Sequence, residues 1–177
     1  MMIIVDVESD GPCPVDYSMV CFGAVVVEDT SRTFFGRTAP LPGAKWDPQA
    51  LAVSGHTREE HLTFMHPETT MLGFEMWLTS LGKTKYQFIS DNPAFDWQWI
   101  NYYFHHFVGH NPFGFSARRI GDFYAGLVKN WRCANDWKSL RVTEHTHHPV
   151  DDAKGNAEAL MAMAHKYSAK LLKVEST

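Results

Sequence analysis

The chain has 177 residues, of which 45% are hydrophobic and 20% charged, and its formal net charge is −4. These values are typical of an ordinary globular protein, and we expect a single domain over residues 1–177. They exclude a transmembrane helix, because no stretch is apolar for long enough to cross a bilayer, and the charge gives no electrostatic sign of a nucleic-acid partner.

The cysteines and the N-terminal residues indicate the cellular compartment in which the protein is expected. Cys13, Cys21 and Cys133 show no CxxC spacing, which argues against a disulfide framework and for a reducing environment. The opening MMIIV is too short for the apolar core of a secretion signal and runs directly into Asp6, so we interpret it as a strand. A cytoplasmic protein without a membrane partner is therefore expected.

Three strands are predicted in the first third of the chain. The segments MMIIVDV (1–7), YSMVCFGAVVVED (17–29) and RTFFGRT (32–38) are rich in β-branched and aromatic residues, and the last two should form a hairpin. From Asp47 to about Leu81 the apolar spacing favours short helices. Thr57 and Glu60 in that stretch have the spacing of a capping box.

The rest of the chain alternates strands and helices. KYQFIS (85–90) predicts a fourth strand, and the helix after it should begin with Asn92 as N-cap and Pro93 as its first residue. FGFSARRIG (113–121) predicts a fifth strand, followed by a helix near DFYAGLVKNW (122–131). The last helix should start after Pro149 with an apolar side formed by Ala153, Ala157, Leu160, Met161 and Ala164. This order predicts an α/β fold in which helices flank a mixed central β-sheet.

Two acids stand at the end of the first predicted strand. Asp6 and Glu8 are two positions apart, so their side chains project from the same face. Carboxylates this close repel each other, and a divalent cation is the usual means of neutralising them. The alternative is an ordinary solvent-facing pair.

Two more acids fall in the first turns of predicted helices. Asp96 follows the fourth strand, and Asp152 lies five positions after His147; each is equally explained as a favourable partner of a helix dipole. The run HTHH (145–148) also leaves a zinc site as an alternative, although a structural zinc site needs four nitrogen or sulfur ligands and no cysteine pair is near.

The motifs DVESDG, NPAFD and HHPVDDA, in this order, resemble those of the DEDDh family of 3′–5′ exonucleases, which have a ribonuclease H-like fold. Between the first two, WDPQALAVSGHTREEHL resembles the family's linking segment, so the resemblance covers nearly the whole chain. The opening DVESDGPCPVDYSM is most similar to a small bacterial and phage branch described as 3′–5′ exoribonucleases.

The resemblance implies a function and a set of roles. Asp6, Glu8, Asp96 and Asp152 would hold two Mg²⁺ or Mn²⁺ ions, and His147 would be the general base, with His148 as its competitor. The enzyme would release nucleoside 5′-monophosphates from single-stranded 3′ ends, RNA preferred, and would form a homodimer. The alternatives are a single-stranded DNA exonuclease and a catalytically inactive, nucleic-acid-binding ribonuclease H-like module.

Further residues are candidates for contacts with the substrate. Ser9 is expected at the terminal 3′ hydroxyl, and Asp10, Met19 and Phe95 are expected nearby, although Met19 and Phe95 fit the core equally well. The segment KNWRCANDWKSLR (129–141), together with Arg118 and Arg119, is either a phosphate-and-base contact region or a solvated surface. Asp91 stands where the family often has histidine, and its role is unassigned.

Overall fold

A mixed five-stranded sheet forms the centre of the computed structural model, which describes residues 1–83 and 85–171. The order of the strands is β3-β2-β1-β4-β5. The antiparallel part contains β1, β2 and β3, and the parallel part contains β1, β4 and β5. Their bounds are Met2–Ser9 (β1), Met19–Val26 (β2), Asp29–Arg37 (β3), Gln87–Ser90 (β4) and Ala117–Arg119 (β5). The predicted mixed sheet is confirmed, with a fifth strand shorter than expected.

The helices fall where the sequence predicts them. They are α1 (Pro48–Val53), α2 (Arg58–His61), α3 (Pro67–Ser80), α4 (Pro93–Phe107), α5 (Ile120–Val128) and α6 (Pro149–Lys166), with 3₁₀ turns η1 (Trp131–Cys133) and η2 (Asp136–Leu140). The predicted capping box of Thr57 and Glu60 is present at α2. Asn92 is the N-cap residue of α4, but its side chain makes no capping hydrogen bond.

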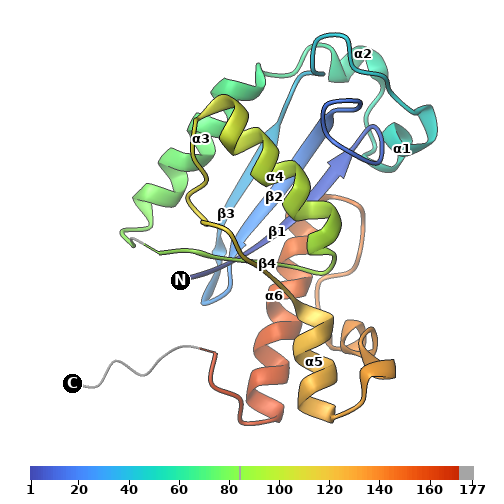
Figure 1. Cartoon of the computed structure of the whole chain (residues 1–177). Coiled ribbons are helices and arrows are strands. Elements are labelled where there is room, and N and C mark those ends of the chain that lie inside the picture. Colours follow the sequence, from blue (N-terminus) through green and yellow to red (C-terminus); the bar gives the residue numbers. More distant parts are fainter. Residues whose placement is uncertain (84, 172–177) are drawn as a thin grey trace.

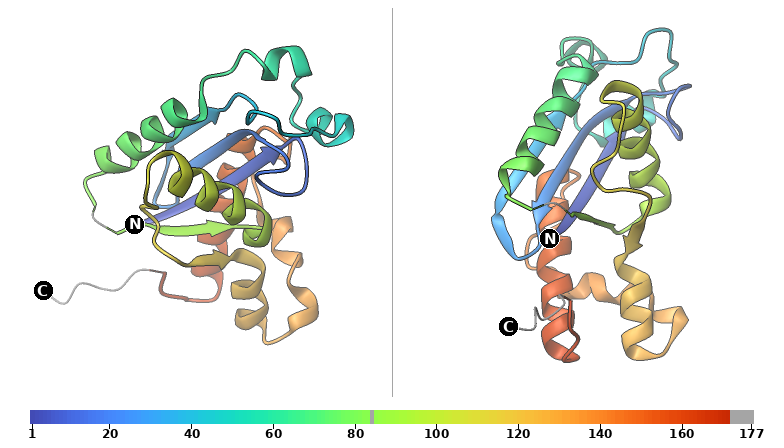
Figure 2. Two further views of the ribbon diagram at one scale, coloured as in Figure 1. Left: turned by 45° about the horizontal axis from the view of Figure 1, so that its top comes forward. Right: turned by 60° about the vertical axis from the view of Figure 1, so that its left-hand side comes forward.

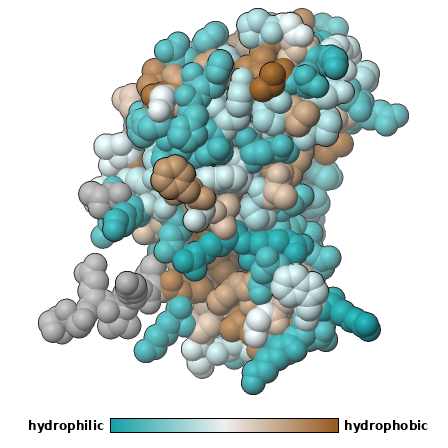
Figure 3. All heavy atoms as spheres, viewed as in Figure 1, coloured by the Kyte–Doolittle hydropathy of each residue, from teal (hydrophilic) through white to brown (hydrophobic). Residues whose placement is uncertain are grey.

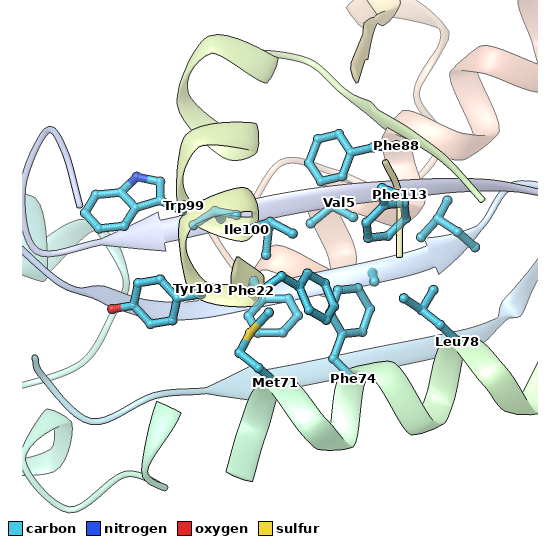
Figure 4. Packing of buried hydrophobic residues seen from close by; sticks show 14 of the residues in the cluster. Val5, Phe22, Met71, Phe74, Leu78, Phe88, Trp99, Ile100, Tyr103 and Phe113 are labelled. Atoms are coloured by element: carbon cyan, nitrogen blue, oxygen red, sulfur yellow. The ribbon is translucent and has the colours of Figure 1, made fainter. Parts of the chain in front are cut away.

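Helices cover both faces of the sheet. Helices α3 and α4 lie over one face and α6 lies against the other, as Figures 1 and 2 show. The alternation of side chains along β1 follows these layers, because Ile3 and Val5 pack under α3 and α4 while Met2 and Ile4 pack against α6. Figure 4 shows the first of these cores, with Val5 among the aromatic side chains of the two helices. Asp6 and Glu8 continue the α6 side of the strand.

The apolar side of α6 differs from the prediction at one position. Ala153, Ala157 and Leu160 are buried as expected, but the side chain of Met161 is 43% exposed. The buried stripe continues instead at Met163, since steps of three and four residues keep a helix on one face, whereas Met161 is turned about 100° from Leu160. The expectation for Met161 was wrong.

The described part of the surface is that of a protein without a membrane-spanning helix. None of the described helices combines the length and apolarity that crossing a bilayer requires. The face of the molecule drawn in Figure 3 is largely hydrophilic, with apolar side chains scattered over it. Cys13, Cys21 and Cys133 are free thiols, which agrees with the expectation that they form no disulfide.

Candidate active site

The candidate site lies where the parallel strands end. The carboxyl ends of β1 and β4 meet at one edge of the sheet, and the first turn of α4 follows β4 directly. From the opposite face the first turn of α6 packs on β2 at Gly23, the register partner of Asp6. A Cβ atom at Gly23 would overlap the backbone of Pro149, so only glycine allows this close approach. The first turns of two helices therefore converge on the end of β1.

Four acids that are distant in sequence come together at this edge. Asp6, Glu8 and Asp152 each offer a carboxylate oxygen, and these atoms all lie within 4.8 Å of one another. Asp96 joins them from the first turn of α4, where its Oδ1 accepts a hydrogen bond of 3.1 Å from the backbone N–H of Val7. The structure thus brings together all four acids that the motifs single out.

Burial and mutual repulsion disfavour the charged forms of these acids. Burial, followed by the charges of Asp96, Glu8 and Asp152, raises the pKa of Asp6 well above its usual range. Burial and then the Asp152 charge raise the pKa of Glu8 to about 7. The pKa of Asp96 rises to about 7, mainly through burial. Oxygen ligands that repel one another in a buried cluster suit a hard divalent cation, which neutralises them, so the donor set fits such an ion.

Among the residues that the structure describes, the cation that opposes this repulsion at Asp6 is a guanidinium that already has other partners. Arg141 lowers the pKa of Asp6 slightly against the four raising effects. Its Nε donates to Asn156 Oδ1 at 2.9 Å, and its Nη2 donates to the backbone carbonyl of Asp152 at 3.2 Å. Arg141 therefore ties the loop before α6 to the helix, and sequence reasoning placed it only in the general basic segment.

Two histidines of the HTHH run approach the acids. Nδ1 of His147 lies 3.8 Å from Glu8 Oε1, and Nδ1 of His145 lies 2.8 Å from Asp152 Oδ2. His148 points elsewhere, with its ring 5.0 Å from the Phe35 ring and its Nδ1 3.6 Å from Asp151. Of the two histidines weighed as the base, the geometry favours His147 over His148.

The Asp152 carboxylate holds the loop of residues 145–148 through two backbone hydrogen bonds. Its Oδ1 accepts from the backbone N–H of Thr146 and its Oδ2 from that of His147, both at 3.0 Å. His147 itself has a left-handed backbone with φ of 61°. The sequence indicated His145 only as part of the zinc alternative, and the signal for a place beside the acids was its position two residues before His147, because a loop that wraps one carboxylate can present both rings. Ligand atoms of His145, His147 and Asp152 also lie within 4.8 Å of one another.

A second wall of the site carries basic and acidic side chains together. A cavity of about 390 Å³ is lined by Asp6, Asp91, Lys138, Arg141 and His145, among others. Lys138 Nζ lies 2.6 Å from Asp91 Oδ2, so Asp91 has a structural partner that the sequence did not reveal. Part of the predicted basic segment therefore reaches the site, whereas its Trp137 is fully buried in the core.

The residues expected to contact substrate are mostly internal. Met19 is fully buried and its backbone N–H donates to the hydroxyl of Tyr103, so of the two alternatives the structure favours the core. Ser9 is 5% exposed and its hydroxyl donates to the Gly11 carbonyl at 2.7 Å. Phe95 is half-buried and packs its ring against Trp99.

Asp10, which was expected near the substrate, is an internal residue instead. Its side chain is completely buried, with Oδ1 accepting from the Ser18 N–H and Oδ2 lying 3.1 Å from Arg58 Nη1. His61 lies 3.7 Å from the same carboxylate. Asp10 thus anchors α2 to the loop after β1, and a buried carboxylate with these partners presents no surface to a substrate.

Comparison with known proteins gives one sequence relative and many related folds. The chain is 34% identical over 178 residues to the "3′-5′ DNA exonuclease Cap18" of Escherichia coli, covering 96% of this chain and 94% of that protein. No family model matches the sequence.

Two solved structures place the fold among nucleases. The nuclease domain of 3′hExo, described as a DEDDh family member bound to rAMP, is similar with a TM-score of 0.74 and 13% identity, covering 99% of this chain and 96% of that one. Exonuclease I of E. coli, in a zinc-bound complex with single-stranded DNA, has a TM-score of 0.59 and 18% identity, covering 92% of this chain and 39% of that one.

Proposed function

Because the chain belongs to the DEDDh family of 3′–5′ exonucleases, we propose that it removes nucleoside 5′-monophosphates one at a time from single-stranded 3′ ends. The observation that carries this proposal is the cluster of Asp6, Glu8 and Asp152 oxygens within 4.8 Å of one another, with Asp96 held beside it. A fold that gathers four mutually repelling acids, two buried and two half-buried, supports catalysis better than an inactive binding module.

Each acid has a role in the proposed reaction. Asp6, Glu8, Asp96 and Asp152 would hold two Mg²⁺ or Mn²⁺ ions, the hard cations that carboxylates prefer. When bound, such a pair of ions would polarise the phosphodiester and make a water molecule more acidic. The Val7 N–H fixes the Asp96 carboxylate, and the N–H groups of the histidine loop fix that of Asp152.

His147 is the proposed general base. It is half-exposed, at the rim of the acid cluster, and its ring faces Glu8. A neutral imidazole is the side chain that most often accepts the proton of an attacking water in general base catalysis. The buried carboxylates are less suited to this task, because each is committed to the cluster.

DNA and RNA are both candidate substrates. The sequence motifs favour RNA, and the structure of 3′hExo contains rAMP. The relative of 34% identity is named a DNA exonuclease, and the exonuclease I structure contains single-stranded DNA. We propose DNA as the first substrate to test, since that relative matches the chain over nearly its full length, and RNA preference stays the alternative.

Matched oligonucleotides decide between them. Purified protein is given single-stranded DNA and RNA of the same sequence, labelled at the 5′ end, with Mg²⁺ or Mn²⁺. We expect a ladder shortening from the 3′ end, faster on DNA, that EDTA abolishes and that Asp6→Asn does not produce. Faster shortening of the RNA would restore the RNA preference, internal cuts would contradict an exonuclease, and activity only with Zn²⁺ would point to the histidine cluster.

A further inference from the structure

The register of the sheet extends the face that carries the acids toward β3. Residues paired directly across antiparallel strands project from the same face. Two rows therefore cross the three strands: Asp6–Gly23–Phe35 and Glu8–Cys21–Arg37. Phe35 and Arg37 lie on the same side of the sheet as the acids, two strand spacings or about 9.6 Å away.

Aromatic and cationic side chains continue from the histidine loop along this face. The ring of His148 lies 5.0 Å from that of Phe35. The Arg37 guanidinium lies 5.8 Å from the Phe35 ring centre and 5.0 Å from that of Phe64. His56 meets the Phe64 ring edge-on at 4.9 Å. We call these five residues the β3 strip; it runs from the candidate site to the edge of the sheet.

The outer part of the β3 strip borders a second cavity. About 590 Å³ of space is lined by Phe35, Arg37, His56 and Phe64, with the first turns of α3 on its far side. This volume lies within the range of small-molecule sites, roughly 300–1,000 Å³. Phe35 is 40% exposed although it is a large apolar residue on an edge strand, so its ring is available to a ligand.

The charges at this cavity favour an anion. Glu60 is the acid that lines it, and its Oε2 already accepts from the Thr57 N–H at 2.9 Å and lies 3.7 Å from His56 Nδ1. Among the described residues no carboxylate forms an ion pair with the Arg37 guanidinium. An unpaired guanidinium between two aromatic rings is the combination with which proteins bind the phosphates and bases of single strands.

We propose that the β3 strip binds the nucleotides on the 5′ side of the scissile bond, with Arg37 on an upstream phosphate and Phe35 and Phe64 stacked on bases. This inference rests on the proposed function, since it takes the 3′ end to lie at the acid cluster. It adds a second binding region that holds the strand while successive nucleotides are removed. A second copy of the chain seated on the β3 edge is the competing occupant.

Substrate length separates the β3 strip from the chemistry. Four proteins are compared on two substrates: wild type, Arg37→Gln, Phe35→Ala and the control Arg32→Gln. The control removes the same charge from the half of β3 that lies nearer the β2–β3 hairpin. One is thymidine 5′-(4-nitrophenyl phosphate), too short to reach the strip; the other is a 12-nucleotide single-stranded DNA. Affinity is measured separately with a 12-mer whose 3′ linkages are phosphorothioates.

Substitution of Phe35 or Arg37 should weaken the binding of the long substrate only. We expect Phe35→Ala to raise KM and Kd for the 12-mer by roughly 5- to 150-fold, equivalent to 1–3 kcal/mol for one stacked base. Arg37→Gln should lower the slope of log K against log salt by about 0.7, the value for one phosphate of a single strand. Arg32→Gln should match wild type, and all four proteins should hydrolyse the short substrate equally.

Several results would overturn the assignment. Wild-type affinity for the 12-mer in both variants would remove the β3 strip as a binding region. Equal losses on both substrates would indicate damage to the site instead. A change in oligomeric state by sedimentation, with 12-mer affinity unchanged, would assign the strip to a second copy. If wild type hydrolyses neither substrate but binds the 12-mer through Arg37, the strip stands and the proposed reaction fails.

Discussion

At the level of single residues, the histidine loop holds two imidazoles that compete for one role. His147 faces Glu8 at 3.8 Å, while His145 is hydrogen-bonded or ion-paired to Asp152 at 2.8 Å. Their ring centres are 4.3 Å apart, so movement of one ring affects the other. A base must have a free nitrogen for the water's proton, and in both rings the contact with the carboxylate is made through Nδ1 and does not use Nε2, so the two histidines must be separated by experiment.

Substitution of each histidine tests this assignment. We expect His147→Ala to lower kcat by roughly 10²- to 10⁴-fold, the usual contribution of a general base, with KM little changed. His145→Ala should act mainly through the position of Asp152 and lower kcat less, and His105→Ala, exposed in the last turn of α4, serves as the control outside the cluster and the β3 strip. Steady-state kinetics at pH 7.5 measure all three. Turnover near wild type in His147→Ala, with a large loss in His145→Ala, would transfer the role to His145.

At the level of elements, the site depends on how closely α6 approaches β2. Gly23 makes that approach possible, because a side chain there would overlap the Pro149 backbone. The same contact sets the position of Asp152, three residues later, against Asp6 on the adjacent strand. A single missing methyl group thus determines whether two of the acids meet.

Gly23→Ala is therefore expected to lower both stability and activity, whereas a matched glycine-to-alanine variant elsewhere should lower neither. Overpacking of this kind costs about 1–3 kcal/mol, and the displaced helix start should lower kcat/KM as well. Gly126→Ala, on the exposed side of α5 where the added atom meets nothing within 4 Å, should be neutral or slightly stabilising. Urea unfolding and kinetics of both variants provide the measurement. Full activity in Gly23→Ala would show that α6 does not need this contact.

For the whole molecule, the buried acids link stability to pH and to divalent ions. The pKa of Glu8 rises from 4.5 to about 7 on folding. Between these values the folded state keeps a proton that the unfolded state has lost, so the free energy of unfolding of metal-free protein falls as pH rises. The shift of Glu8 is worth up to about 3 kcal/mol above pH 7. Buried His61, whose pKa falls to about 4, acts in the opposite sense below pH 6.5.

The comparison of wild type with Glu8→Gln isolates the carboxylate, because His61 contributes equally to both. In EDTA the variant should match wild type near pH 4.5 and become more stable by several degrees in Tm at pH 8. Mg²⁺ or Mn²⁺ should raise the Tm of wild type at pH 8 and raise that of the variant less. Thermal unfolding monitored by circular dichroism across this pH range gives the result. A pH-independent difference, or equal stabilisation by the ions, would contradict a metal site that includes Glu8.

Local pattern was sufficient for the secondary structure. The β-branched runs and the capping box depend on neighbours a few residues away, which is why the sequence predicted the mixed sheet correctly. The four acids came from the resemblance to a family, and although the structure brings them together, their roles as metal ligands stay predictions. The single domain, the cytoplasmic location and the homodimer stay predictions. The predicted burial of Met161 was wrong, because which side of α6 is buried depends on where its apolar stripe meets the sheet.

Other features were decided only when distant segments met in space. The pairing of Asp91 with Lys138, the burial of Asp10 against Arg58, and the contact of His145 with Asp152 join residues from different loops, and no periodicity records such partners. The β3 strip likewise exists because strand register aligns Phe35 and Arg37 with Asp6 and Glu8. The sequence by itself determined which elements form and which acids follow them; the tertiary structure decided their partners, because side-chain contacts and burial depend on how those elements pack.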